Sequence, residues 1–303
     1  EKLIQRTFTH MGRAERLLRS LNVHYIWIFR LWFITLIQLH PAQAAEETYP
    51  PVASNVSFEE VTALPFRESD YQINYGDNTL QFGRLWLPTS ANLGTLIFVH
   101  GGCWANEYGI DHAQALGTAL ASEGYAVWSL EYRRTGDEGG AWPGAFEDVV
   151  VGINKIVDLE DYGLNMKNLT LMGHSAGGHL AVLAGARPEL IAVKPNLIVG
   201  LAAITDVVSY ARGENSCEQA TVAFMGGSPA ERPEAFGEAQ AVNFDVSSNT
   251  VLFYGDIDEI VPSSQANLPG AISRLHEGAG HFDWIHPGTG AFREMLSILS
   301  KEL

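Results

Sequence analysis

Most of the chain after residue 66 alternates between short apolar runs and helical stretches. The apolar runs are continuous, which is typical of parallel strands covered by helices on both faces. We therefore predict strands over residues 95–100, 125–132, 168–172, 197–204, 251–254 and 272–275. The stretches between and after them predict helices over residues 110–123, 143–159, 176–186 and 290–303.

Two further β-rich runs, residues 66–75 and 81–88, are joined by Gly76-Asp77-Asn78, and this turn signal predicts a hairpin. The whole pattern indicates an α/β fold with a mostly parallel central sheet and helices on both faces. Residues 208–249 interrupt the pattern with a polar, Gly- and Pro-containing stretch that we expect to hold two short helices. Such an insertion would form a small cap above the carboxyl ends of the strands, where open sheets bind ligands.

The first 45 residues differ in composition from the rest of the chain. Three arginines at positions 13, 16 and 19 precede an apolar run over residues 23–39, and Ala42 and Ala44 fit a signal-peptidase site. The part of this run over residues 31–39 has the length of a signal-peptide core and is too short for a membrane span. We predict that residues 1–45 are a cleaved signal peptide, with an uncleaved anchor as the alternative. Residues 46–303 would then form one exported domain, periplasmic or secreted.

The net charge of −16 argues against a nucleic-acid partner, because a phosphate backbone would be repelled. The charged fraction of 18% and the hydrophobic fraction of 46% are typical of a globular protein. The two cysteines, Cys103 and Cys217, are compatible with one disulfide in an exported protein and equally with two thiols. Neither has neighbours of the kind that bind metals, so we expect no zinc site.

A Gly-rich turn follows the predicted strand over residues 168–172. Gly173-His174-Ser175-Ala176-Gly177 is a G-x-S-x-G pattern, and a helix is predicted to begin at its fourth residue. In this context a sharp strand-to-helix turn requires small residues on either side of the serine and leaves its hydroxyl exposed. The pattern therefore predicts that Ser175 is a catalytic nucleophile.

A second Gly-rich turn, His100-Gly101-Gly102-Cys103-Trp104, directly follows the predicted strand over residues 95–100. Glycines allow a backbone to approach a substrate closely. The N–H groups of Gly102 and Cys103 could therefore join that of Ala176 in an oxyanion hole, where each donor contributes about 3–4 kcal/mol to transition-state stabilisation.

The acid and the base of a Ser-acid-His triad follow the serine in chain order. Asp256 and Asp258 both come after the predicted strand over residues 251–254, and either could be the acid. Among the later histidines, His281 lies in a Gly-rich loop after the last strand and is the predicted base. His276, at a strand end, and His286, before a proline, are expected to be structural or to lie at a pocket rim.

These motifs resemble those of the α/β-hydrolase superfamily, and within it the esterase/lipase group with an H-G-G-x-W oxyanion motif. This group includes kynurenine formamidase-like and feruloyl-esterase-like enzymes, and the similarity runs from about residue 94 to the C-terminus. Its D-x-x-V-P spacing implies that Asp258, which precedes Val261-Pro262, is the acid. The chain departs from the group at Cys103, where some members have a third oxyanion glycine.

The resemblance also implies supporting roles for other residues. The segment Glu131-Tyr132-Arg133 is expected to support the floor of the active site through packing and ion pairs. Glu147 and Asp148 lie near the start of a predicted helix and are expected to interact with its dipole.

The predicted chemistry is acyl transfer to water. Ser175 would attack the carbonyl, His281 would carry the proton and Asp258 would orient the histidine, so that no metal or other cofactor is needed. We predict a serine carboxylesterase that cleaves small-molecule esters of small or medium acyl groups through an acyl-enzyme. The alternatives are an arylformamidase-type amidase and, in another class, a catalytically inactive hydrolase fold used for binding.

Three apolar residues are candidates for the substrate pocket. Trp104 belongs to the predicted oxyanion turn, and Phe224 and Met225 belong to the predicted cap. Packing in the core or the cap explains each of them equally well.

Overall fold

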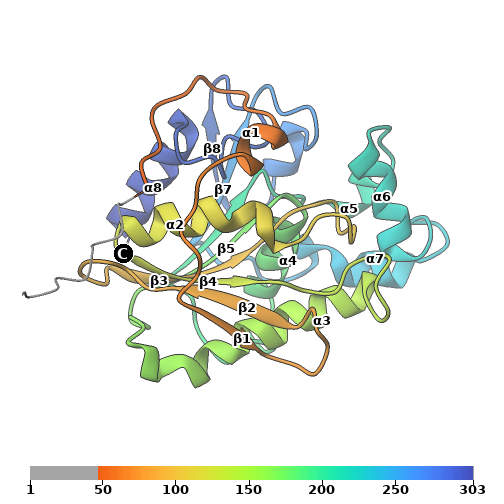
Figure 1. Cartoon of the computed structure of the whole chain (residues 1–303). Helices are drawn as coiled ribbons and strands as arrows, with labels where there is room; N and C mark the ends of the chain where they lie inside the picture. The colour runs from red at the N-terminus through yellow and green to blue at the C-terminus, as the bar shows by residue number, and fades with distance from the viewer. Residues whose placement is uncertain (1–46, 303) are drawn as a thin grey trace, which may run out of the picture. The chain divides into compact units, whose positions relative to one another are not determined.

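The computed structural model describes residues 47–302 (Figure 1). The predicted signal peptide or anchor over residues 1–45 lies outside this range. No helix within residues 47–302 combines the length and the apolar character needed to cross a bilayer.

A single eight-stranded sheet confirms the predicted architecture. Its spatial order is β1-β2-β4-β3-β5-β6-β7-β8. The first two strands form the predicted hairpin, β2 pairs with β4 antiparallel, and the remaining neighbours are parallel. The strands are β1 (Tyr71–Asn74), β2 (Phe82–Trp86), β3 (Gly94–Val99), β4 (Tyr125–Leu130), β5 (Leu169–His174), β6 (Leu197–Leu201), β7 (Thr250–Gly255) and β8 (Ile272–His276).

Helices follow most of the parallel strands, as the pattern predicts. Outside the cap they are α1 (Phe58–Thr62), η1 (Ile110–Ala113), α2 (Gln114–Ser122), α3 (Ala141–Asn154), η2 (Lys155–Tyr162), α4 (Ser175–Gly185), η4 (Ser263–Ala266) and α8 (Gly290–Glu302). The helix predicted over residues 110–123 begins as the 3₁₀ turn η1, and Gly124, with a φ of 96°, follows its end. A residue in this left-handed conformation ends a helix most easily when it is glycine.

Two clusters of buried apolar side chains lie on the two faces of the sheet. Along β3, Ile97 and Val99 belong to one cluster, whereas Leu96 and Phe98 belong to the other, because successive side chains of a strand point to opposite faces. Residues of α3 and α4 complete the first cluster, and residues of α2 and α8 complete the second (Figure 1). Both faces are therefore covered, which explains the continuous apolar runs.

The cap contains more helices than predicted. Instead of two, the described chain has α5 (Val207–Tyr210), α6 (Ser216–Met225), α7 (Pro233–Ala239) and the 3₁₀ helix η3 (Ala241–Asn243). Each α-helix has a local start signal that the prediction did not use. Asp206 caps α5, Asn215 and Glu218 form a capping box at α6, and Pro233 occupies the first turn of α7.

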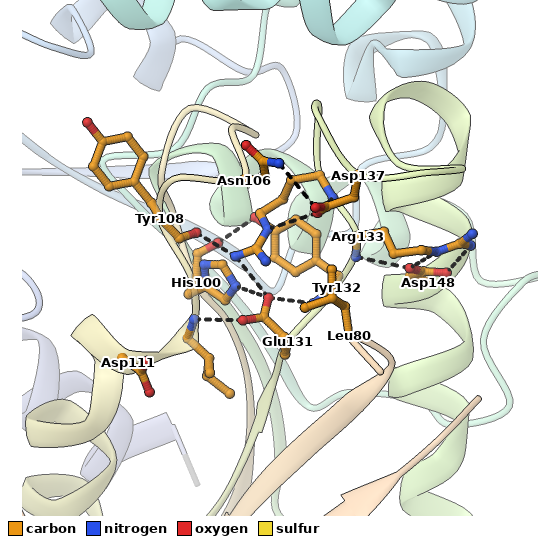
Figure 2. Close-up of polar contacts among 12 residues, drawn as sticks. Leu80, His100, Asn106, Tyr108, Asp111, Glu131, Tyr132, Arg133, Asp137 and Asp148 are labelled. Carbon is orange, nitrogen blue, oxygen red and sulfur yellow. Dashed lines mark hydrogen bonds and ion pairs between the residues drawn. The ribbon is translucent and has the colours of Figure 1, made fainter. Parts of the chain in front are cut away.

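The predicted role of Asp148 was wrong. Helix α3 begins at Ala141, so that Asp148 lies in its middle and is buried. Its carboxylate accepts hydrogen bonds from Arg133 Nε at 2.8 Å and Nη2 at 2.6 Å (Figure 2). It also accepts one from Gln81 Nε2 at 2.6 Å. Asp148 therefore joins α3 to the segment after β4, and does not serve the helix dipole.

The segment before the sheet, residues 47–70, is here called the N-terminal arm. Asp283, which is fully buried, attaches it to the C-terminal part of the chain. The Asp283 carboxylate accepts the backbone N–H groups of Asn55 at 2.7 Å, Val56 at 3.0 Å and Gly280 at 2.7 Å. One side chain therefore holds both the arm and the loop that carries His281.

We expect Asp283→Ala to detach the arm and to destabilise the fold. The substitution leaves three backbone donors without their acceptor, and each such loss costs about 1–3 kcal/mol when the donor stays buried. The free energy of unfolding in urea should fall by about 2–4 kcal/mol, and limited proteolysis should cleave within residues 47–70. Asp245→Ala, at an exposed turn, is the control. Wild-type stability and an intact arm in Asp283→Ala would contradict the assignment.

Candidate active site

Ser175 lies at the turn from β5 to α4, as predicted from the G-x-S-x-G pattern. Its φ of 54° falls in the left-handed region, which non-glycine residues rarely adopt. The residue is the first of α4, so the helix N-terminus and its unpaired N–H groups lie beside it. Its backbone is therefore in the strained turn that presents a nucleophilic side chain.

The glycines around Ser175 are required by close backbone packing. A Cβ on Gly173 would overlap the carbonyl oxygen of Gly177, and a Cβ on Gly177 would overlap the carbonyl oxygens of Val99 and His100. The turn at Ser175 is therefore pressed directly against the end of β3, which leads into the predicted oxyanion turn.

The predicted oxyanion turn lies next to the serine. A Cβ on Gly101 would come within 3.0 Å of the Ser175 Cβ. Gly102 and Cys103 have φ values of 115° and 51°, so the backbone turns sharply here. Among the hydrogen bonds of the described residues, none uses the N–H of Gly102 or Cys103. These donors are therefore free to bind an oxyanion.

The structure brings His281 and Asp258 together. The distance from His281 Nδ1 to Asp258 Oδ2 is 2.8 Å, and the Asp258 side chain is 1% exposed. The other carboxylate oxygen accepts the N–H groups of Ile260 and Val261, both at 2.8 Å. The residues of the D-x-x-V-P spacing thus hold Asp258 in place. Asp256 instead accepts the N–H of Gly278 at 2.6 Å in an exposed turn.

The other histidines near the C-terminus do not contact Asp258. His276 pairs through Nδ1 with Glu294 at 2.5 Å, and His286 accepts the N–H of Gly288 at 3.1 Å within a loop.

His174, which precedes Ser175, contacts the loop of His281. Its Nε2 donates to the carbonyl oxygen of His281 at 2.9 Å. Burial, and the nearby His281, hold the pKa of His174 well below its usual value. A neutral His174 therefore supports the backbone of the His281 loop.

Glu131 is the central residue of a buried polar network next to the oxyanion turn (Figure 2). Its carboxylate contacts His100 Nε2 at 3.0 Å and Arg134 Nη1 at 3.1 Å, and accepts the N–H of Ile110 at 3.0 Å. Burial alone would raise the pKa of Glu131, but the contacts with His100, Arg134 and the Ile110 N–H outweigh it and lower the pKa to about 2.

The same network also reaches the oxyanion turn at His100 and the segment after the turn at Tyr108. The Tyr132 hydroxyl donates to the carbonyl oxygen of His100 at 2.9 Å, and Arg134 Nη1 donates to the carbonyl oxygen of Tyr108 at 2.6 Å. Glu131 and Tyr132 of the predicted segment thus support the turn, whereas Arg133 pairs with Asp148. The buried ion-pair partner of Glu131 is Arg134, which lies just outside the predicted segment.

A cavity of about 250 Å³ connects the predicted catalytic residues. Ser175, His281, Gly102 and Cys103 all line it. Its other lining residues come from the arm, the segment after the oxyanion turn, the end of β5, the cap and the loops after β7 and β8: Phe58, Glu59, Tyr108, His112, His174, Ser216, Cys217, Ile260 and Phe282.

The three predicted pocket residues do not line this cavity. Trp104 and Phe224 are fully buried and Met225 is 1% exposed. The rings of Trp104 and Phe224 stack with centroids 4.6 Å apart and planes 6° from parallel. All three therefore pack in the core and not in the cavity wall. Burial of their large apolar surfaces joins the cap helix α6 to the oxyanion turn.

The arm contributes lining residues that sequence reasoning missed. Phe58 and Glu59 belong to α1, whose capping box between Ser57 and Glu60 was a detectable helix signal. Nothing local indicated that this short helix would lie over the cavity. Tyr108 and His112 were missed for the same reason, since each lies outside the motifs. Phe282 directly follows the predicted base His281, but nothing local indicated that its ring would line the cavity.

Cys103 and Cys217 form a disulfide, which resolves the alternative left open by their spacing. Their Cα atoms are 5.0 Å apart and 114 residues separate them in sequence. The bond joins the oxyanion turn to α6 of the cap, and both residues line the cavity. It therefore fixes one wall of the candidate site covalently.

The comparisons with known proteins agree with this geometry. A family model described as BD-FAE matches residues 85–269, which is more than half of the chain. The chain belongs to the BD-FAE family. The family is of the α/β-hydrolase esterase type, so the resemblance inferred from the motifs is confirmed. The matched range includes Ser175, Asp258 and the oxyanion turn, whereas His281 lies beyond it.

Individual relatives support the same placement of this BD-FAE member. The chain is 31% identical over 119 residues to esterase LipC of Mycobacterium tuberculosis, covering 38% of this chain and 29% of that protein. It is 29% identical over 182 residues to the isoprenylcysteine alpha-carbonyl methylesterase ICME of Arabidopsis thaliana, covering 59% of this chain and 39% of that protein. The chain therefore spans less than half the length of these two relatives.

A solved structure supports the fold. Esterase B of Lactobacillus rhamnosis aligns with a TM-score of 0.67 at 19% identity, covering 81% of this chain and 91% of that chain. The predicted α/β-hydrolase fold is thereby confirmed.

We expect Cys217→Ser to lower the free energy of unfolding by about 3–5 kcal/mol, because the disulfide closes a long loop in the unfolded chain. Chemical denaturation measures this change. Treating the wild type with a dithiol reductant should reproduce the loss, and the variant should not respond to the reductant. Equal stability of the oxidised and reduced wild type would contradict the expectation.

Proposed function

We propose that this protein is a serine carboxylesterase. One observation carries the proposal: Ser175, His281 with its partner Asp258, and the free N–H groups of Gly102 and Cys103 converge on one cavity. A nucleophile, a general base held by a carboxylate and oxyanion donors are together the requirements for acyl transfer. The names of the two curated relatives, an esterase and a methylesterase, support esters as substrates.

In the first half of the reaction, Ser175 Oγ attacks the carbonyl carbon of the ester while His281 Nε2 takes the serine proton. Asp258, bound to Nδ1, keeps that nitrogen protonated and stabilises the imidazolium. The N–H groups of Gly102, Cys103 and Ala176 bind the negatively charged oxygen. His281 then gives the proton to the departing alcohol, and Ser175 is left acylated.

In the second half, a water molecule attacks the acyl carbon and His281 accepts its proton. The tetrahedral intermediate collapses, the acid leaves and the proton returns to Ser175. The cavity of about 250 Å³ is smaller than most drug-binding pockets, which favours small or medium acyl groups. The nucleophile, the base with its carboxylate partner and the oxyanion donors are all groups of this chain.

We further propose that the protein acts after export to the periplasm or outside the cell. The basic and apolar pattern of the first 45 residues supports this, and so does the disulfide, since such bonds persist in oxidising compartments.

Ser175→Ala should abolish ester hydrolysis, because no other group can form the acyl-enzyme. We expect the rate with p-nitrophenyl acetate to fall at least about a thousandfold, and the wild type to prefer acetate over octanoate. Ser297→Ala removes a hydroxyl from an exposed position of α8 that does not line the cavity, and is the control with activity close to wild type. Faster wild-type turnover of N-formylkynurenine than of any p-nitrophenyl ester would favour an amidase. Equal rates for the Ser175→Ala variant and the wild type would refute a serine esterase.

The two neighbouring aspartates provide a second test. Asp258→Asn should lower kcat by about 10³–10⁴-fold, because the amide favours the wrong tautomer of His281. Asp256→Asn, two residues away, should change kcat by no more than a few-fold, since its carboxylate contacts only the Gly278 N–H among the described residues. Steady-state kinetics with p-nitrophenyl acetate compares them. A larger loss in Asp256→Asn would reverse the assignment of the acid.

A further inference from the structure

The cavity beside Ser175 has one fixed charge of its own. Glu59 is the acidic residue among its lining side chains, and no lysine or arginine lines the cavity in the described part of the chain. Burial, followed by the charge of His100, lowers the pKa of His112 to about 3, and His174 is also held neutral. The cavity lining therefore carries the negative charge of Glu59, and no lining lysine or arginine neutralises it.

Glu59 is held in place by the fold of the arm. The capping box of Ser57 and Glu60 fixes the start of α1, and Asp283 fixes the two residues before it. The Phe58 ring packs on three rings of the cavity wall, with centroids 5.7 Å from Tyr108, 5.6 Å from His112 and 5.5 Å from Phe282. These contacts fix the backbone of α1, and the exposed residue Glu59 lines the cavity from this helix.

Aromatic rings surround the same part of the cavity. Phe58, Tyr108 and Phe282 all line it together with Glu59. The face of an aromatic ring attracts a cation, and rings combined with a carboxylate are the chemistry by which proteins bind quaternary ammonium groups. Among the described residues, this wall offers no positively charged side chain that would hold an anionic group.

We propose that this wall selects esters that carry a cationic group, such as a quaternary ammonium, over neutral esters of the same shape. The inference rests on the proposed esterase function, because it assigns the substrate class of that site. Glu59 is then a specificity-determining residue. It contributes to binding, while Ser175, His281 and Asp258 carry out the chemistry.

Acetylcholine and its uncharged isostere 3,3-dimethylbutyl acetate form the test pair, because they differ only in one atom, a positively charged nitrogen in place of a neutral carbon. We expect kcat/KM of the wild type to be about three- to tenfold higher for acetylcholine than for 3,3-dimethylbutyl acetate. This is the gain expected from a partly screened ion pair combined with a cation–π contact. Glu59→Gln should bring the ratio of the two kcat/KM values close to one, mainly by raising KM for acetylcholine. Glu68→Gln removes the same charge from an exposed position of the arm and should leave the ratio unchanged.

Binding to the Ser175→Ala variant, measured by calorimetry with the same two esters, gives a readout that needs no turnover. Tighter binding of acetylcholine that disappears in the Ser175→Ala, Glu59→Gln double variant supports the proposal even if hydrolysis is absent. If the wild type hydrolyses the neutral ester, and the ratio of kcat/KM for acetylcholine to that for the neutral ester is the same in the wild type and Glu59→Gln, the proposed selectivity is overturned. The esterase function would then still stand. Failure of the wild type to hydrolyse either ester or p-nitrophenyl acetate would instead refute the proposed function.

Discussion

The candidate site depends on the contact between two backbones at the carboxyl ends of β3 and β5. No side chain fits between them, since a Cβ on Gly177 would overlap the carbonyl oxygens of Val99 and His100. Because these segments touch, the turn after β3 and the turn after β5 face the same cavity. A parallel sheet places strand ends at one edge, but only glycines bring these two ends into direct contact.

The parts of the molecule around this contact hold it by different means. A buried network centred on Glu131 supports the oxyanion turn from below. The disulfide and the stacked rings of Trp104 and Phe224 attach the same turn to the cap. The carboxylate of Asp283 holds the loop of His281 from the other side. A polar network, a covalent bond and apolar packing therefore constrain the oxyanion turn, and a buried carboxylate constrains the loop of His281.

The sequence was informative wherever a residue pattern is tied to a local conformation. Continuous apolar runs predicted the sheet, and the glycines around Ser175 predicted its turn, because few other residues fit there. Lining residues of the cavity could not be predicted in this way. Trp104 and Phe224 are apolar whether they line a pocket or fill a core, and only their packing partners decide between the two. Glu59 carried no signal, because its neighbours in the cavity are distant in sequence.

The attachment of the arm also bears on the order in which the molecule is assembled. Asn55 and Val56 bind Asp283, which lies 228 and 227 residues later in the chain. During synthesis the arm is made before the sheet, but its acceptor appears only after every strand of the sheet. Contacts so distant in sequence are among the slowest to form. A nascent chain can thus contain the folded turn at Ser175 while one wall of its cavity is still missing.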